Sequence, residues 1–87
     1  MSSSSGMSLS QAVTLAIRLA VIREDVPMSE VAYRAGMKPR RLYARMRTCG
    51  AWSMSELDAI AHVLFNGDVL ELFRMAAYEQ QHAEVSI

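Results

Sequence analysis

The sequence predicts an all-α fold, a single compact domain of five helices. Three stretches have the spacing of a helix N-terminal capping box, in which Ser or Asp is followed three residues later by Gln or Glu. They begin at Ser8, Ser53 and Asp68. Aromatic residues make up 7% of the chain, and no stretch alternates apolar and polar residues for long enough to indicate a strand. A chain of 87 residues is well below the length at which proteins divide into domains.

Two helices are predicted in the first part of the chain. The first runs from Ser8 to about residue 23, because Val13, Ile17 and Val21 recur at helical spacing. Pro27 is tolerated at or before a first helical turn, so a second helix is predicted over residues 28–35. Residues 1–7 are rich in Ser and Gly and predict a disordered arm ahead of the domain, which spans residues 8–82.

A tight turn and a third helix follow. Gly36 is placed to take the left-handed conformation that ends a helix, and Met37 should fill the turn from the inside. Pro39 at a first helical position predicts a third helix over about residues 39–47. Leu42 and Met46, four residues apart, should fix this helix to the core.

The last two helices are predicted from their apolar stripes. Trp52 and Leu57 flank the second capping box as a hydrophobic staple, and a helix over residues 54–65 follows. Asn66 and Gly67 should end this helix, and a fifth helix should continue to about Gln81, with residues 83–87 frayed. The stripe of the fourth helix consists of Leu57, Ile60, Ala61 and Leu64.

Positive charge is concentrated in one segment of a chain whose net charge is zero. Residues 31–55 contain six basic side chains and no acidic one. Because no acid is interleaved, we expect these charges to be free for a partner rather than paired within the helices. Positive charge on the second helix of a helix, turn and helix is what a reader of the DNA major groove needs. The six residues are Arg34, Lys38, Arg40, Arg41, Arg45 and Arg47.

The segment from Pro27 to Leu42 resembles the helix-turn-helix of the phage Cro and repressor family, the XRE class. Ala32 lies where two helices would cross closely, Gly36 lies in the turn, and the stripe of the fourth helix fits the same family. The resemblance covers about residues 13–72 and implies a lambda-repressor-like fold. Pro27 and Met28 stand where the family usually has a Ser or Thr cap and a phosphate-binding Gln. Residues 31–47 also resemble one half of the AraC-type DNA-binding domain.

The resemblance also implies which residues contact DNA. The third helix would enter the major groove, with arginines on G·C pairs and Tyr43 or Ala44 on a thymine methyl group. The residues predicted to read bases are Lys38, Arg40, Arg41, Tyr43 and Ala44. Phosphate contacts are predicted for Met28, Ser29, Arg34, Arg45, Arg47 and Thr48.

One domain of this kind reads about half of an operator, so we expect a symmetric dimer on a palindromic duplex. The fifth helix is the candidate interface, because it carries more apolar residues than a short terminal helix needs; the alternative is that they close the core of the monomer. These residues are Val69, Leu72, Phe73, Ala76 and Ala77. The implied function is a Cro-like phage or prophage repressor that occludes a promoter. An antitoxin that represses its own operon and a protein-interaction module without DNA binding are the alternatives.

The sequence contains no pattern typical of an enzyme, and it predicts no cofactor, no metal and no small-molecule ligand. His62 and His82 lack partners at metal-ligand spacing, and the five methionines at 28, 37, 46, 54 and 75 are predicted to fill the core. A single cysteine, Cys49, suits a reducing compartment, and the chain has no long apolar run or signal-peptide pattern. We therefore expect a cytoplasmic protein of a bacterial host cell that does not bind membranes.

Overall fold

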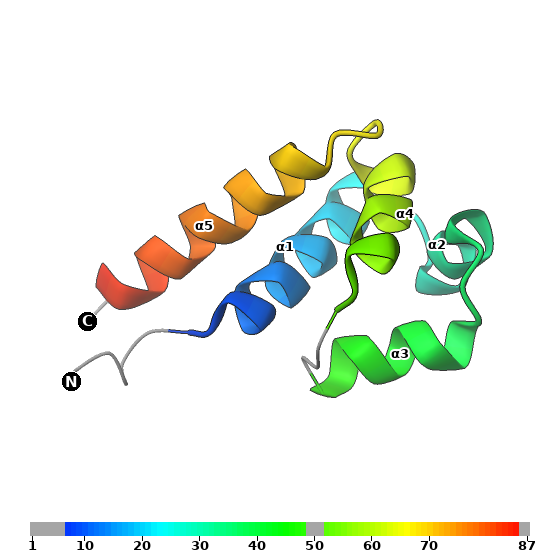
Figure 1. The fold of residues 1–87 in the computed structure, drawn as a ribbon, viewed down its shortest axis with the longest axis horizontal. Helices are drawn as coiled ribbons and strands as arrows, with labels where there is room; N and C mark the ends of the chain where they lie inside the picture. The colour runs from blue at the N-terminus through cyan, green and yellow to red at the C-terminus, as the bar shows by residue number, and fades with distance from the viewer. Residues whose placement is uncertain (1–6, 49–51, 86–87) are drawn as a thin grey trace.

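Five α-helices follow one another in the computed structural model, which describes residues 7–48 and 52–85, with side chains to residue 82 (Figure 1). They are α1 (Leu9–Glu24), α2 (Met28–Ala35), α3 (Pro39–Thr48), α4 (Met54–Leu64) and α5 (Val69–Val85). The described residues contain no strand, and the all-α prediction is confirmed. None of the helices in this part of the chain has the length and apolar character needed to cross a bilayer. The predictions for residues 1–6, Cys49 and residues 86–87 lie outside the described residues.

The helices begin where the capping residues predict. The Ser8 hydroxyl accepts from the backbone N–H of Gln11 at 3.1 Å, and the Gln11 side chain accepts from the N–H of Ser8 at 2.9 Å. Ser53 and Glu56 form the same reciprocal pair at the start of α4. The Asp68 carboxylate accepts two backbone N–H bonds at the start of α5. Each cap pairs backbone donors that would otherwise lack an acceptor in the first turn.

The turn between α2 and α3 has the backbone that the glycine predicts. Gly36 has φ +72°, its N–H donates to the Tyr33 carbonyl, and the Met37 N–H donates to the Ala32 carbonyl at 2.9 Å. This pair of hydrogen bonds is the Schellman arrangement that ends many helices. After Lys38 the chain enters α3 at once, so α2 and α3 are held close together.

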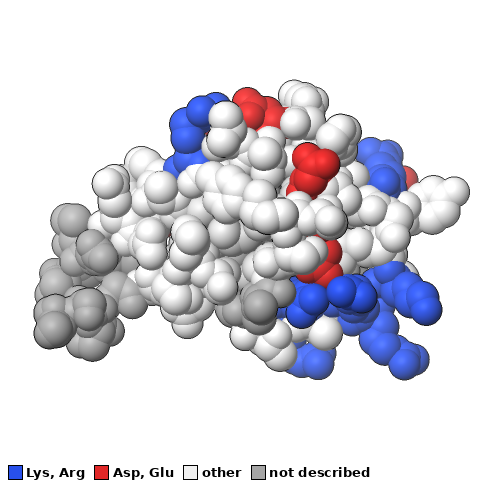
Figure 2. Space-filling view, in the orientation of Figure 1, with Lys and Arg blue, Asp and Glu red and all other residues white. Residues whose placement is uncertain are grey.

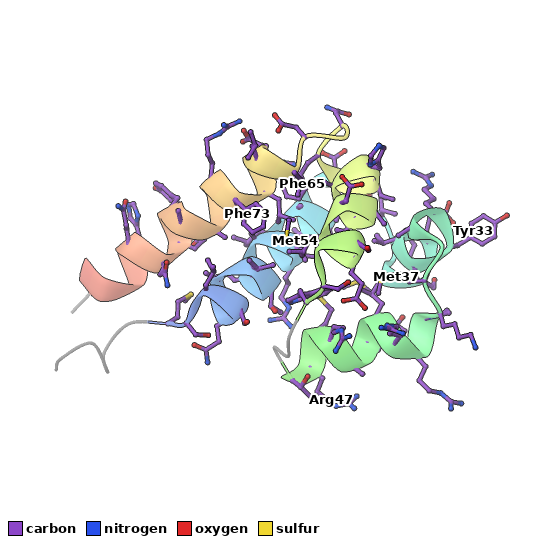
Figure 3. The ribbon with its side chains drawn as sticks, viewed as in Figure 1. Tyr33, Met37, Arg47, Met54, Phe65 and Phe73 are labelled. Atoms are coloured by element: carbon purple, nitrogen blue, oxygen red, sulfur yellow. The ribbon has the colours of Figure 1, made fainter. Side chains whose placement is uncertain are left out.

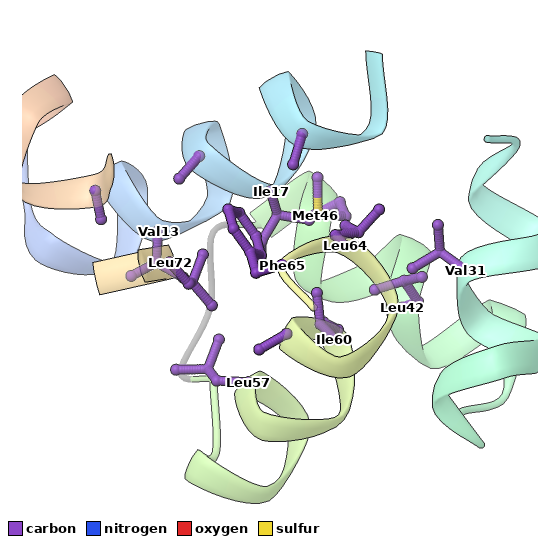
Figure 4. Close-up of a cluster of buried hydrophobic side chains, with 14 of the residues drawn as sticks. Val13, Ile17, Val31, Leu42, Met46, Leu57, Ile60, Leu64, Phe65 and Leu72 are labelled. Carbon is purple, nitrogen blue, oxygen red and sulfur yellow. The ribbon is translucent and has the colours of Figure 1, made fainter. Parts of the chain in front are cut away.

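The helices pack in two groups. α1 and α5 run antiparallel, side by side, while α2, α3 and α4 gather at the other end of the molecule (Figure 1). One core joins the groups: Ile17, Ile60 and Leu72 are fully buried in it, as are Val31 and Leu42 at the α2–α3 end (Figure 4). Because Leu42 and Met46 both face this core, α3 presents its opposite side outward.

The ends of the fold differ from the predictions. α5 continues to Val85, where the sequence predicted an end near Gln81. Met7, predicted to belong to a disordered arm, packs against the core, and its carbonyl accepts from the Gln80 side chain at 3.0 Å. Met54, predicted to fill the core, is exposed. α4 ends at Leu64, and Phe65 is its buried C-terminal cap residue.

Two of the five residues predicted for a dimer interface on α5 are fully buried in the single chain. Leu72 and Ala76 are 0% exposed in the single chain, where they lie in the core. A side chain without exposed surface in the monomer has none to offer a second copy. Val69 and Phe73 are half-buried against the same core, and Ala77 is exposed. The face of α5 therefore serves mainly to close the monomer, the alternative that the sequence left open.

Candidate nucleic-acid interface

α3 presents a basic, exposed side to solvent. Leu42 and Met46 bury one side of this helix, and on the other side Arg40, Tyr43 and Arg47 are exposed. In Figure 2 the Lys and Arg atoms gather over this part of the molecule, and Figure 3 shows Arg47 pointing away from the body of the protein. The first turn of α3 contains no acidic residue. The side of α3 that faces away from the core is thus predominantly positive.

An open cleft of about 490 Å³ adjoins the N-terminal end of α3. It lies between the α2–α3 turn and the beginning of α4, and its lining combines two basic side chains with hydroxyl groups and one carboxylate. These polar lining residues are Lys38, Arg41, Ser53, Ser55 and Glu56. The end of α3 at which base reading is predicted is therefore unobstructed by the rest of the fold.

A carboxylate on α4 pairs with two of the α3 arginines, contrary to the expectation that the basic segment is free of acidic partners. Glu56 Oε2 accepts from Arg41 Nε at 2.7 Å, and Glu56 Oε1 accepts from Arg45 Nε at 3.1 Å. Arg45 also donates from a terminal nitrogen to Oε2 at 3.2 Å. Glu56 follows the acid-free segment immediately in sequence, and the first turn of α4 lies close enough to α3 for this side chain to reach back to that segment. Part of the positive charge is therefore structural.

The surroundings of Glu56 hold it in the ionised form. Burial by itself would raise the pKa of the carboxyl group, whose side chain is 8% exposed. The backbone N–H of Ser53 and the side chains of Arg41 and Arg45 outweigh that effect and lower the pKa from 4.5 to about 2. At neutral pH the site therefore contains one carboxylate between two guanidinium groups.

A second ion pair involves Arg34 on α2. Its Nε donates to Glu30 Oε2 at 2.9 Å, one helical turn earlier, and both side chains are largely exposed. An exposed i, i+4 pair of this kind contributes only about 0.3–0.5 kcal/mol. Arg34 is therefore also not free in the isolated protein, although a phosphate could compete for it at little cost.

The remaining residues of the predicted interface differ in how freely they could contact DNA. Arg45 is 28% exposed and bound to Glu56, which makes it a poor candidate for a phosphate contact. The Thr48 hydroxyl donates to the Ala44 carbonyl at 2.8 Å, and Ala44 is half-buried. Met28 packs against the core while Ser29 is exposed. No side chain caps the start of α2, because Pro27 occupies that position.

Three basic residues of the segment have no ion-pair partner among the described residues. All three are exposed and lie on α3 or immediately before it. They are Lys38, Arg40 and Arg47. At these positions an anionic partner could be bound by a side chain that has no ion pair in the described part of the free protein.

Sequence reasoning did not identify Glu56 as part of this site. Its capping-box spacing was visible, but its pairing with α3 depends on how α4 packs, which no local pattern encodes. Arg18 of α1 was missed for the same reason: its guanidinium donates to the Met46 carbonyl at 3.5 Å, near the C-terminal end of α3. A cation there stabilises the negative end of the helix dipole.

No three His, Cys, Asp or Glu side chains within residues 7–48 and 52–85 come together as metal ligands. Every buried side-chain nitrogen or oxygen in this part of the chain has a hydrogen-bond partner. Comparisons of the chain with protein-family models, with curated proteins and with solved structures find no match.

Proposed function

We propose that this protein binds duplex DNA sequence-specifically, with α3 in the major groove. The observation that carries the proposal is the two-sidedness of α3. One side is anchored in the core by Leu42 and Met46, and the other presents Arg40 and Arg47 without acidic partners among the described residues. A helix that is rigidly held and basic on its outer side has the properties that groove reading requires.

The dimensions of α3 suit this role. Ten residues of α-helix are about 15 Å long, and the major groove is about 12 Å wide and admits one helix. The turn at Gly36 and the open cleft beside Lys38 leave the N-terminal end of α3 accessible. Tyr43, exposed in the middle of the helix, could contact a thymine methyl group with its ring.

The phosphate contacts that we propose come chiefly from the unpaired cations. Lys38, Arg40 and Arg47 each neutralise a phosphate, or read a base, without losing an ion pair seen in the free protein. The uncapped N-terminus of α2 adds backbone N–H groups at Met28 and Ser29. Binding of this kind to a site that overlaps a promoter would repress transcription by occlusion.

Salt-dependent binding to defined duplexes tests the proposal. A duplex library randomised over about two helical turns is selected against the purified protein, and the affinity for the best duplex is measured between 50 and 200 mM salt, the range over which phosphate binding weakens markedly. Three neutralised phosphates predict a loss of affinity on the order of 40-fold over that range. Arg47→Ala should reduce the salt slope by about 1.

Arg74→Ala is the matched control. It removes the same charge from α5, which lies on the opposite side of the molecule from α3, and should leave the salt slope unchanged (Figure 1). A wild-type protein that binds no duplex at low salt contradicts the proposal and favours a module for protein interaction.

If two copies dimerise on DNA through α5, the interface has to consist of side chains that the monomer leaves exposed on that helix. Among the five predicted interface residues these are Ala77 with the half-buried edges of Val69 and Phe73, and the exposed side chains of α5 also include Leu70 and Tyr78. Ala77→Arg should leave the monomer folded and lower the sedimenting mass of any dimer. A folded variant with unchanged mass removes the surface around Ala77 as the interface.

A further inference from the structure

We infer that Glu56 is a positioning residue for sequence recognition: it fixes Arg41 through Nε, so that the terminal nitrogens of Arg41 are presented to a guanine. The inference rests on the proposed DNA binding and names a determinant of its specificity. It also separates the α3 cations into one that is oriented and others that are free.

The Glu56 carboxylate is itself immobile. Its side chain is 8% exposed, and Oε1 accepts from the backbone N–H of Ser53 at 2.9 Å as part of the cap of α4. Arg45 donates to Oε1 at 3.1 Å and to Oε2 at 3.2 Å, and Arg41 donates to Oε2 at 2.7 Å. A carboxylate has about four acceptor positions. All of them are thus occupied, and the group has no freedom to rotate.

Arg41 is bound at one edge and free at the other. Its Nε–H is used on Glu56, while the described residues offer no acceptor for its two terminal nitrogens, and the side chain is 61% exposed. The O6 and N7 atoms of guanine accept two parallel N–H bonds from such a guanidinium edge. The same residue lines the open cleft at the N-terminal end of α3. Arg41 can therefore keep its contact with Glu56 while it binds a base.

The other exposed arginines of α3 lack this support. Arg40 and Arg47 have no ion pair among the described residues, so they must give up side-chain freedom when they bind. A donor that is already oriented loses less freedom on binding and discriminates more sharply between acceptors in different positions. We therefore assign discrimination to Arg41, and general affinity to Arg40 and Arg47.

Arg45 completes the arrangement from the buried side. It is 28% exposed and donates to both oxygens of Glu56, so it holds the carboxylate rather than a partner molecule. This explains why a residue predicted to bind phosphate lies largely inside the fold.

Glu56→Gln tests the inference, because glutamine keeps the shape and also caps helices at this position. The chain itself uses Gln11 in the same way at the start of α1. The readout is the ratio of affinities for the best selected duplex and for duplexes with one G·C pair replaced. We expect the preference for the one guanine that Arg41 contacts to fall on the order of tenfold. Affinity for a random-sequence competitor duplex should stay the same or rise, because a negative charge is removed.

A second variant covers the case in which Glu56→Gln fails to fold. Arg41→Lys keeps the charge and the Glu56–Arg45 contact but lacks the planar fork, and it should lose the preference for the same guanine. The double variant with Glu56→Gln and Arg41→Lys should lose no more of the preference for that guanine than Arg41→Lys alone loses. Glu30→Gln is the control: it removes the same charge from the exposed Arg34 pair and should leave the preference unchanged.

The outcomes separate the two proposals. If the wild type binds no duplex at all, the proposed function is overturned, and this inference with it. Two results with a wild type that binds DNA overturn the positioning role alone. In the first, Arg41→Lys keeps the full preference for the guanine. In the second, folded Glu56→Gln binds the selected duplex and the competitor duplex more weakly by the same factor.

Discussion

The indole Nε1 of Trp52 donates a hydrogen bond to the Thr14 hydroxyl oxygen at 3.0 Å, which ties the residue preceding α4 to the buried side of α1. The same Thr14 hydroxyl donates to the Ser10 carbonyl at 2.9 Å, so it both accepts and donates inside the fold. Trp52 thus combines the predicted staple with a polar contact that the sequence did not reveal. Its indole N–H is engaged within the protein and is not free for a phosphate.

Trp52→Phe should destabilise the protein by about 1 kcal/mol beyond the loss of apolar area, because it removes the hydrogen bond and leaves Thr14 with one acceptor site unfilled. Urea denaturation followed by circular dichroism measures the change. Thr14→Val should cost on the order of 1–3 kcal/mol, since the partly buried indole then lacks an acceptor. If the two substitutions are additive in the double variant, the hydrogen bond contributes nothing.

Gly36→Ala should destabilise the fold by about 1–2 kcal/mol through the backbone alone. Gly36 has φ +72°, and a Cβ placed on it meets no atom within 4 Å, so steric crowding by neighbours is not involved. Gly36→Asn should cost less, because asparagine tolerates the left-handed conformation better. Thermal unfolding of both variants gives the comparison. Equal losses for Ala and Asn contradict a backbone origin.

Stability should fall in acid partly because of Glu56. Its pKa is lowered to about 2 in the folded protein, so its contribution is complete above the unfolded value of 4.5 and is lost as the pH falls toward 2. The full contribution amounts to about 3 kcal/mol, of which about 2 kcal/mol should be lost by pH 3.

The difference between wild type and Glu56→Gln isolates this contribution, because the other carboxyl groups titrate in both proteins. Denaturation experiments should show that the free energies of unfolding of the wild type and of Glu56→Gln differ less at pH 3 than at pH 7. A gap that stays constant across this range argues against a lowered pKa for Glu56.

Leu72→Ala should cost about 3 kcal/mol and lower the stability of the monomer, because this side chain is fully buried within a single chain. The measurement is denaturation at several protein concentrations. A midpoint that does not depend on concentration fits a core residue. If the variant instead keeps the stability of the wild type and changes only its sedimenting mass, Leu72 belongs to an interface.

Local signals in the sequence are sufficient to predict the helices and the turn between α2 and α3. Ser8, Ser53 and Gly36 each act within a few residues of themselves, which is why their roles could be predicted. The start of α3 at Pro39 follows from the same kind of local constraint. The end of α5 was misplaced because no Gly or Pro marks it before Val85.

The candidate site could be predicted only in part, because the pairing of charges depends on tertiary packing. An acid-free segment does not imply unpaired arginines when Glu56 on the next helix folds back against Arg41 and Arg45. The apolar residues of α5 were likewise ambiguous, since burial of Leu72 against α1 and burial in a dimer call for the same pattern. The choice between them required the position of α1.

The antiparallel packing of α1 against α5 also joins segments that lie far apart in the sequence. α5 covers the apolar side of α1, so this side stays open until Leu72 and Ala76 have packed against it. Pairing of the first helix with the last also lengthens the loop that must close during folding. The core that anchors the basic helix α3 is therefore complete only after α5 has docked on α1.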